Sequence, residues 1–142
     1  FYPLDQNIYQ SVKGMTAAEA TCKPGGVIID VTACADGHGG EAFFNTLKDA
    51  TDVQKAMDEI LARGRNETIF DQWESQILMR LLLNFTIIMV TKAPQDMVEA
   101  MHLKYAANID EAFTMAKGIL ANKGITDPKV TVIPDGVSVI VK

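Results

Sequence analysis

The chain has 142 residues, of which 48% are hydrophobic and 22% are charged, and its formal net charge is −5. This composition is typical of a globular domain and excludes a disordered polymer, and an acidic chain without a basic run is a poor binder of nucleic-acid phosphates. No apolar stretch reaches the roughly 18–20 residues that a membrane-spanning helix needs, so we expect neither nucleic acid nor a membrane as partner. Two cysteines, Cys22 and Cys34, are too few for a disulfide framework or a zinc cluster, and a reducing, cytoplasmic location is expected.

Helical patterns and one β-branched run make up the first half of the chain. The predicted helices cover residues 6–13, 16–21, 41–48 and 53–62. Asp5 is a suitable N-cap for the first helix, which Gly14 is expected to end. Val27–Ala33 is almost continuously apolar, as is typical of a strand buried on both faces, and it leads directly into the glycine-rich loop Asp36–Gly40.

The second half predicts more strands separated by helices. Asp71 is expected to cap a helix, and Thr86–Thr91 predicts a second buried strand. The further expected elements are helices over 72–84, 94–105 and 110–122, a strand over 129–133 and an extended segment over 137–142. Strands alternating with helices favour an α/β fold, in which a mostly parallel sheet forms a three-layer sandwich with helices on both faces. We expect residues 1–142 to form a single domain.

The first predicted helix carries two polar side chains that suit a small anion. At about 100° per residue, Ile8 and Val12 fall on one side of this helix, and Gln10 and Lys13 cluster on the opposite side. Because Gln10 and Lys13 are three residues apart, their side chains project next to each other. An ammonium beside an amide suits a carboxylate with a neighbouring hydroxyl. The alternative is an ordinary solvated helix face.

A second candidate is the loop of Asp36, Gly37, His38, Gly39 and Gly40, which lies between a predicted strand and a predicted helix. Glycines allow the backbone to approach a ligand closely, and a helix N-terminus favours an anion. This possible site loop matches no phosphate-binding motif, and the alternative is a tight turn that requires glycine. His38 is a possible acid–base group.

Trp73 and His102 are the remaining candidates. Trp73 is the only tryptophan and lies in the first turn of the helix over 72–84. It is either a core or interface aromatic or the wall of a substrate pocket. His102 lies within a predicted helix and is expected to be a packed or surface histidine.

Five segments, taken in order, carry a resemblance to one protein family. They are Tyr2–Ala20, Gly25–Ile29, Asp36–Glu41, Asp71–Trp73 and Val130–Lys142. Together they resemble the C-terminal domain of the nickel-dependent lactate racemase family, over nearly the whole chain. Because the sequence begins with Phe1 and covers only one of that family's two domains, we expect it to be part of a longer protein.

The resemblance implies an activity and a cofactor. Family members interconvert the enantiomers of lactate or related 2-hydroxy acids with a nickel pincer nucleotide, derived from nicotinic acid, which accepts and returns the α-hydrogen as a hydride. The resemblance places the lysine that tethers the cofactor, the nickel-binding histidine and the acid–base histidines in an N-terminal domain outside this sequence. It therefore implies no metal ligand and no catalytic residue in this chain. The partners implied are the protein's own N-terminal domain and a small 2-hydroxy acid.

The same resemblance assigns binding roles to four residues. Through the motif Tyr-Gln-x-x-Lys, the substrate-contacting glutamine and lysine of the family correspond to Gln10 and Lys13. Tyr9 and Trp73 correspond to a tyrosine and a tryptophan of the active site. The 142 residues alone are expected to be inactive.

Two alternatives remain open at the level of sequence. The enzyme could racemise or epimerise another 2-hydroxy acid. The chain could instead be a non-enzymatic α/β module that binds a small anion through its glycine loop. The sequence upstream of this chain would distinguish the second alternative, because a module of that kind would lack the histidine-rich N-terminal domain.

Overall fold

The structure is a computed structural model, and it describes residues 2–139. Within that range the sheet has three parallel strands, in the order β1 (Val27–Val31), β2 (Thr86–Val90) and β3 (Lys104–Ala106). Val27 lies opposite Thr86 in the first pair of strands, and Ile88 lies opposite Lys104 in the second. Parallel neighbours need crossover connections, and helices provide both of them.

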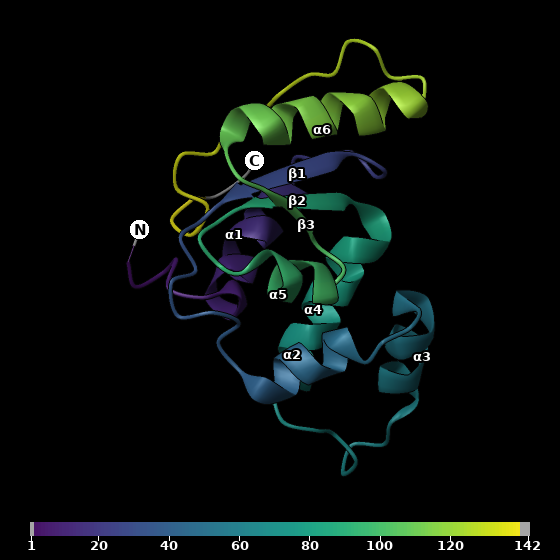
Figure 1. Cartoon of the computed structure of the whole chain (residues 1–142). Coiled ribbons are helices and arrows are strands. Elements are labelled where there is room, and N and C mark those ends of the chain that lie inside the picture. Colours follow the sequence, from purple (N-terminus) through teal and green to yellow (C-terminus); the bar gives the residue numbers. More distant parts are fainter. Residues whose placement is uncertain (1, 140–142) are drawn as a thin grey trace.

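The helices lie on both faces of this sheet. They are α1 (Ile8–Glu19), α2 (Glu41–Lys48), α3 (Val53–Ala62), α4 (Gln72–Asn84), α5 (Gln95–Ala100) and α6 (Ile109–Asn122). Figure 1 shows α6 along one face, α1, α4 and α5 against the other, and α2 and α3 packed beyond α4. The predicted three-layer α/β architecture is therefore confirmed.

Each face of the sheet has its own apolar core. Ile87 and Met89 of β2 are fully buried in the larger core, which includes α1 and α4. Ile88 points to the opposite face, where it packs with Ala106 and with Ala112 of α6. Alternate residues of a strand point to opposite faces, and for this reason the buried strands are apolar at nearly every position.

The start of the chain differs from the prediction in the length of its helix and in the residue that caps it. A single helix, α1, replaces the two short helices, and Gly14 lies within it rather than at its end. Its N-cap is Asn7, not Asp5, and the Asn7 side chain accepts a hydrogen bond from the Gln10 backbone N–H at 2.9 Å. Packing of Val12 and neighbouring apolar residues against the sheet stabilises the helix through Gly14.

The predicted helix over 94–105 was also wrong in its second half. Helix α5 ends early because His102 adopts a left-handed conformation with φ 62°, and its ring Nε2 lies 3.0 Å from the Leu47 carbonyl oxygen. Leu103 then enters the core, and the next three residues form β3. His102 is exposed, so it is a surface histidine, which is one of the two placements expected for it.

The predicted strand over 129–133 does not form. Val130 and Val132 in this segment are 61% and 77% exposed, so their β-branched side chains have no packing face that would stabilise a strand. The extended segment Val137–Lys142 forms no strand in its described part, and residues 140–142 lie outside the described residues.

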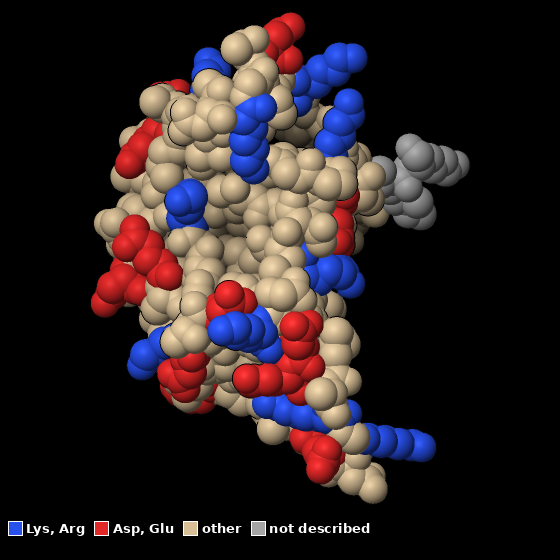
Figure 2. Space-filling model, turned by 90° about the vertical axis from the view of Figure 1, so that its right-hand side faces the viewer, with Lys and Arg blue, Asp and Glu red and all other residues tan. Residues whose placement is uncertain are grey.

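Charges are mixed on the surface of the domain. On the face drawn in Figure 2, Lys and Arg side chains are interspersed with Asp and Glu and form no continuous basic patch. Across residues 2–139, the helices are all too short or too polar to cross a membrane.

Asp30 in β1 supplies a prediction about stability. The Ser11 hydroxyl of α1 donates a hydrogen bond to the Asp30 carboxylate, yet burial raises the pKa of Asp30 from 3.8 to about 6. Because this pKa is raised on folding, the folded state holds the proton more tightly, and stability falls as pH rises from about 4 through 6. We expect Asp30→Asn to stabilise the chain at pH 8 by about 2 kcal/mol, and by less at pH 5.

Urea unfolding of both chains at the two pH values measures this effect. Asp58→Asn on the exposed surface of α3 is the control, and it should change stability little at either pH. A destabilised Asp30→Asn chain at pH 8 would contradict the prediction.

Candidate functional site

The glycine-rich loop after β1 holds the start of α1. The backbone N–H groups of Ile8 and Tyr9 donate to the carbonyl oxygens of Gly37 and His38 at 3.0 and 3.1 Å. These bonds satisfy donors that a helix N-terminus leaves unpaired. The loop therefore sets the position of α1, and with it the polar side of that helix.

The polar pair predicted from spacing is present on α1. The Lys13 ammonium donates to the Gln10 side-chain oxygen at 2.5 Å, and the Lys13 side chain is exposed. The first two turns of α1 thus present a positive charge and an amide together. Such a pair can bind a carboxylate and a neighbouring hydroxyl.

Tyr9 connects this pair to α4. Its ring makes edge contacts with Phe43, at a centroid distance of 5.4 Å, and with Trp73, at 5.9 Å. Its hydroxyl donates to the Asp71 carboxylate at 3.2 Å. Burial, followed by the charge and hydrogen bond of Asp71 and the charge of Glu74, raises the pKa of Tyr9 to about 12. Tyr9 is therefore a neutral hydrogen-bond donor at any physiological pH.

Trp73 is not a core residue, because 53% of its surface is exposed. It lines an open cavity of about 410 Å³ together with Met57, Leu61, Gln76, Ile77 and Arg80. The Trp73 ring thus contacts Tyr9 on one side, lines this cavity and is partly exposed to solvent. The exposure of Trp73 excludes a core position. It agrees with an interface aromatic and with the wall of a substrate pocket, and the second of these stays a prediction.

Two residues next to Trp73 were missed as site residues. Asp71 was expected to cap α4, but its side chain makes no capping bond, and its backbone is left-handed with φ 57°. Its carboxylate holds the Tyr9 hydroxyl instead. Glu74 is only 1% exposed although it lies in the first turn of a helix. An acidic residue is so common in the first turn of a helix that Glu74 could not be singled out from its position.

The loop Asp36–Gly40 meets this cluster at only one end. A Cβ atom on Gly40 would lie 3.3 Å from an Asp71 carboxylate oxygen and 3.8 Å from the Tyr9 ring. Asp36 lies at the other end, where its backbone N–H donates to the Gln6 carbonyl at 2.8 Å. Gly37 and Gly39 have φ of 73° and 88°, which favours the turn interpretation, and a ligand role for the loop stays a prediction.

His38 is engaged within the domain. Its ring stacks on Phe44 at 4.6 Å, and its Nδ1 accepts a hydrogen bond from the Gly40 backbone N–H at 3.1 Å. Its Nε2 lies 3.5 Å from the Glu41 carboxylate. These contacts orient the ring toward α2 and not toward the Gln10 and Lys13 pair.

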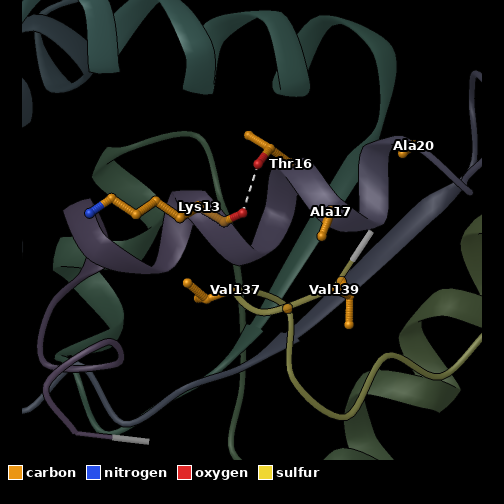
Figure 3. A pocket seen from close by; sticks show the side chains of 7 residues that line it. Lys13, Thr16, Ala17, Ala20, Val137 and Val139 are labelled. Atoms are coloured by element: carbon orange, nitrogen blue, oxygen red, sulfur yellow. Dashed lines mark hydrogen bonds between the residues drawn. The ribbon is translucent and has the colours of Figure 1, made fainter. Parts of the chain in front are cut away.

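The end of the described chain forms a groove along α1. The segment after α6 returns to α1, where Gly136 approaches Gly14 so closely that an added Cβ would lie 3.0 Å from the Gly14 Cα. The groove has a volume of about 430 Å³ and is lined by Lys13, Thr16, Ala17, Ala20, Gly136, Val137 and Val139. Figure 3 shows Lys13 at one end of this surface, with Val137 and Val139 on the segment that runs beside α1.

A metal-binding set is not found in this part of the chain. Residues 2–139 contain no group of three or more His, Cys, Asp or Glu side chains that could hold a metal ion. Both histidines, His38 and His102, have contacts within the domain. The described side chains therefore do not fit the role of a nickel site.

Comparisons with known proteins agree with one another. Residues 1–141 match the family described as the lactate racemase C-terminal domain. The chain is 56% identical to the lactate racemase of Thermoanaerobacterium thermosaccharolyticum and 49% identical to that of Lactiplantibacillus plantarum, in each case over 99% of this chain and 32% of the relative.

The fold agrees as well. The solved structure of the lactate racemase apoprotein from T. thermosaccharolyticum matches with a TM-score of 0.92 and 55% identity, over 99% of this chain and 33% of that one. The chain thus spans about a third of the length of these relatives. With the family match over residues 1–141, this shows that the chain belongs to the lactate racemase C-terminal domain family.

Proposed function

We propose that this chain is the substrate-binding, C-terminal domain of a lactate racemase-like enzyme that interconverts the enantiomers of a 2-hydroxy acid. The relatives named lactate racemase, at 56% and 49% identity, support the reaction class. The observation that carries the proposal is the Gln10 and Lys13 pair in the first two turns of α1. It directly follows Tyr9, whose ring contacts Trp73.

Each of these residues has a role that its chemistry supports. Lys13 pairs its ammonium with the substrate carboxylate. Gln10 already accepts a hydrogen bond from Lys13 through its oxygen, so its amide nitrogen donates to the substrate hydroxyl. Tyr9 and Trp73 form an aromatic wall that excludes water from one side, which strengthens the charged contact by lowering the local dielectric.

The hydrogen transfer belongs to the rest of the protein. The family resemblance implies a nickel pincer nucleotide in the N-terminal domain, and that group supplies the redox chemistry at the α-carbon when it is bound. The described residues of this chain do not offer a nickel site, so we assign them binding and orientation only. Holding the substrate in the correct orientation can contribute a large part of the rate acceleration in reactions that need precise alignment.

The cellular location is part of the proposal. Cys22 and Cys34 are both free thiols, which suits a reducing compartment. We therefore place the enzyme in the cytoplasm.

The test is racemisation by the nickel-loaded, full-length protein. A panel of single enantiomers of 2-hydroxy acids, lactate among them, is incubated with the protein and analysed by chiral chromatography. We expect at least one acid, lactate first, to be converted to a mixture of both enantiomers, and the 142-residue chain alone to leave every acid unchanged. A fully loaded protein that converts none of the acids would refute the proposed reaction.

A further inference from the structure

Glu74 is a buried carboxylate that the proposed binding roles do not use. Its residue is 1% exposed, and its Oε1 atom has no hydrogen-bond partner among the described residues. It lies in the first turn of α4, directly after Trp73 and three residues after Asp71. An unpartnered buried carboxylate oxygen is costly, so its presence in the wall of a candidate site calls for a functional account.

The charges around Glu74 come from the candidate site. Helices α1 and α4 pack against each other, and Tyr9 and Lys13 of α1, one turn apart, both interact electrostatically with Glu74. The carboxylate of Asp71 is the other charge that acts on it. Helices α2 and α3 and strand β2, which also adjoin α4, contribute buried apolar side chains to the same core, including Phe43, Leu47, Met57, Ile60 and Ile87.

These surroundings make the charge of Glu74 depend on Lys13. Burial raises the pKa of Glu74 to about 7, and the Lys13 ammonium opposes that rise, whereas Asp71 adds to it. Lys13 is therefore the cation that favours the ionised form of Glu74. Any anion that neutralises Lys13 removes that support and adds a further negative charge nearby.

We propose that Glu74 is the internal counter-charge of Lys13 and takes up a proton from solvent when a substrate carboxylate pairs with Lys13. This inference rests on the proposed function, because it assumes that Lys13 binds the substrate carboxylate. The free site holds an ammonium and the Glu74 carboxylate, and the bound site holds the ammonium, the substrate carboxylate and a neutral Glu74. Lys13 stays protonated throughout, and one proton from solvent balances the added anion.

Two measurable consequences follow for substrate binding. Above about pH 7, binding of a 2-hydroxy acid carries proton uptake, and affinity falls as pH rises by up to about tenfold per unit. In Glu74→Gln the side chain keeps its shape but has no charge to lose. This variant should therefore bind lactate about tenfold more tightly than the parent at pH 8 and with similar affinity at pH 6.

The experiment is calorimetric titration of L-lactate into the full-length protein at pH 7.5, in buffers with different ionisation enthalpies. The dependence of the binding enthalpy on the buffer gives the number of protons taken up. We expect about one-half to one proton per lactate for the parent protein, and none attributable to this site in Glu74→Gln. Glu59→Gln on the exposed surface of α3 is the matched control and should retain the parent value.

The outcomes separate this inference from the proposed function. Absence of proton uptake in the parent protein, or unchanged uptake in Glu74→Gln, overturns the role of Glu74 while lactate binding itself stands. Weaker binding by Glu74→Gln at pH 8 also overturns it, because a merely structural role predicts that loss. A Lys13→Ala protein that binds lactate normally would instead refute the binding role of Lys13.

Discussion

The substitution Lys13→Ala is expected to lower kcat/KM of the full-length protein for lactate by about 10²–10³-fold. Removal of one member of a desolvated charge pair costs about 3–4 kcal/mol. Under the proposed function, the other partner is the substrate carboxylate, which would lose its counter-charge. Steady-state racemisation with a chiral assay measures the effect.

The fold should not change in this variant. The Lys13 side chain is exposed, and its ammonium donates its hydrogen bond to Gln10 on the surface. The control is Lys123→Ala, which removes a lysine that donates to the Gly25 carbonyl at 2.7 Å, away from the candidate site. Circular dichroism should be unchanged in both variants, and activity should be lost only in the first. Near-normal activity in Lys13→Ala would contradict the assignment of this residue.

The adjacency of Gln10 and Lys13 was predictable because helix geometry is local. A spacing of three residues places two side chains together on any regular helix, so the pair did not depend on where the helix began or ended. The predicted contact between Gln10 and Lys13 is present, although the helix is longer than expected and is capped by Asn7. The binding role of the pair remains a prediction.

The sheet shows where local patterns were insufficient. Strand β2 is buried on both faces, whereas β1 is only partly buried and ends at the exposed Val31. Both strands were predicted from their nearly continuous apolar sequences. Strand β3 has only three residues, Lys104–Ala106. It follows α5 so closely that its residues were included in the predicted helix. The segment 129–133 had β-branched residues but no neighbouring strand, and β propensity has little force without a packing partner.

The parts of the site on α4 depend on tertiary contacts. Asp71 lies 62 residues from Tyr9 in the sequence, and its carboxylate accepts a hydrogen bond from the Tyr9 hydroxyl. Glu74 is buried by the packing of α1 on α4, and no spacing rule in the sequence encodes that contact. Only the fold could reveal that these two carboxylates lie beside the residues found by resemblance.

The substitution Gly39→Ala is expected to destabilise the chain by about 2–4 kcal/mol. Gly39 has φ 88°, a conformation that side chains rarely adopt, and an added Cβ would lie 2.5 Å from Asn7 Cγ. Asn7 caps α1 and is 8% exposed. Relief of the clash would therefore displace the cap that fixes the helix carrying Gln10 and Lys13. Urea unfolding measures the loss.

Two other glycines separate the contributions to that loss. Gly124 has φ 78° but no atom of the described chain within 4 Å of an added Cβ, so Gly124→Ala should show backbone strain alone, about 1 kcal/mol. Gly118 lies in α6 with the same free space and helical dihedrals, so Gly118→Ala should stabilise by about 0.5–1 kcal/mol. If Gly39→Ala cost no more than Gly124→Ala, the contact with Asn7 would not be what requires glycine in the loop. The larger loss expected for Gly39 would tie the loop to the position of α1, and thus to the site, without any direct contact with substrate.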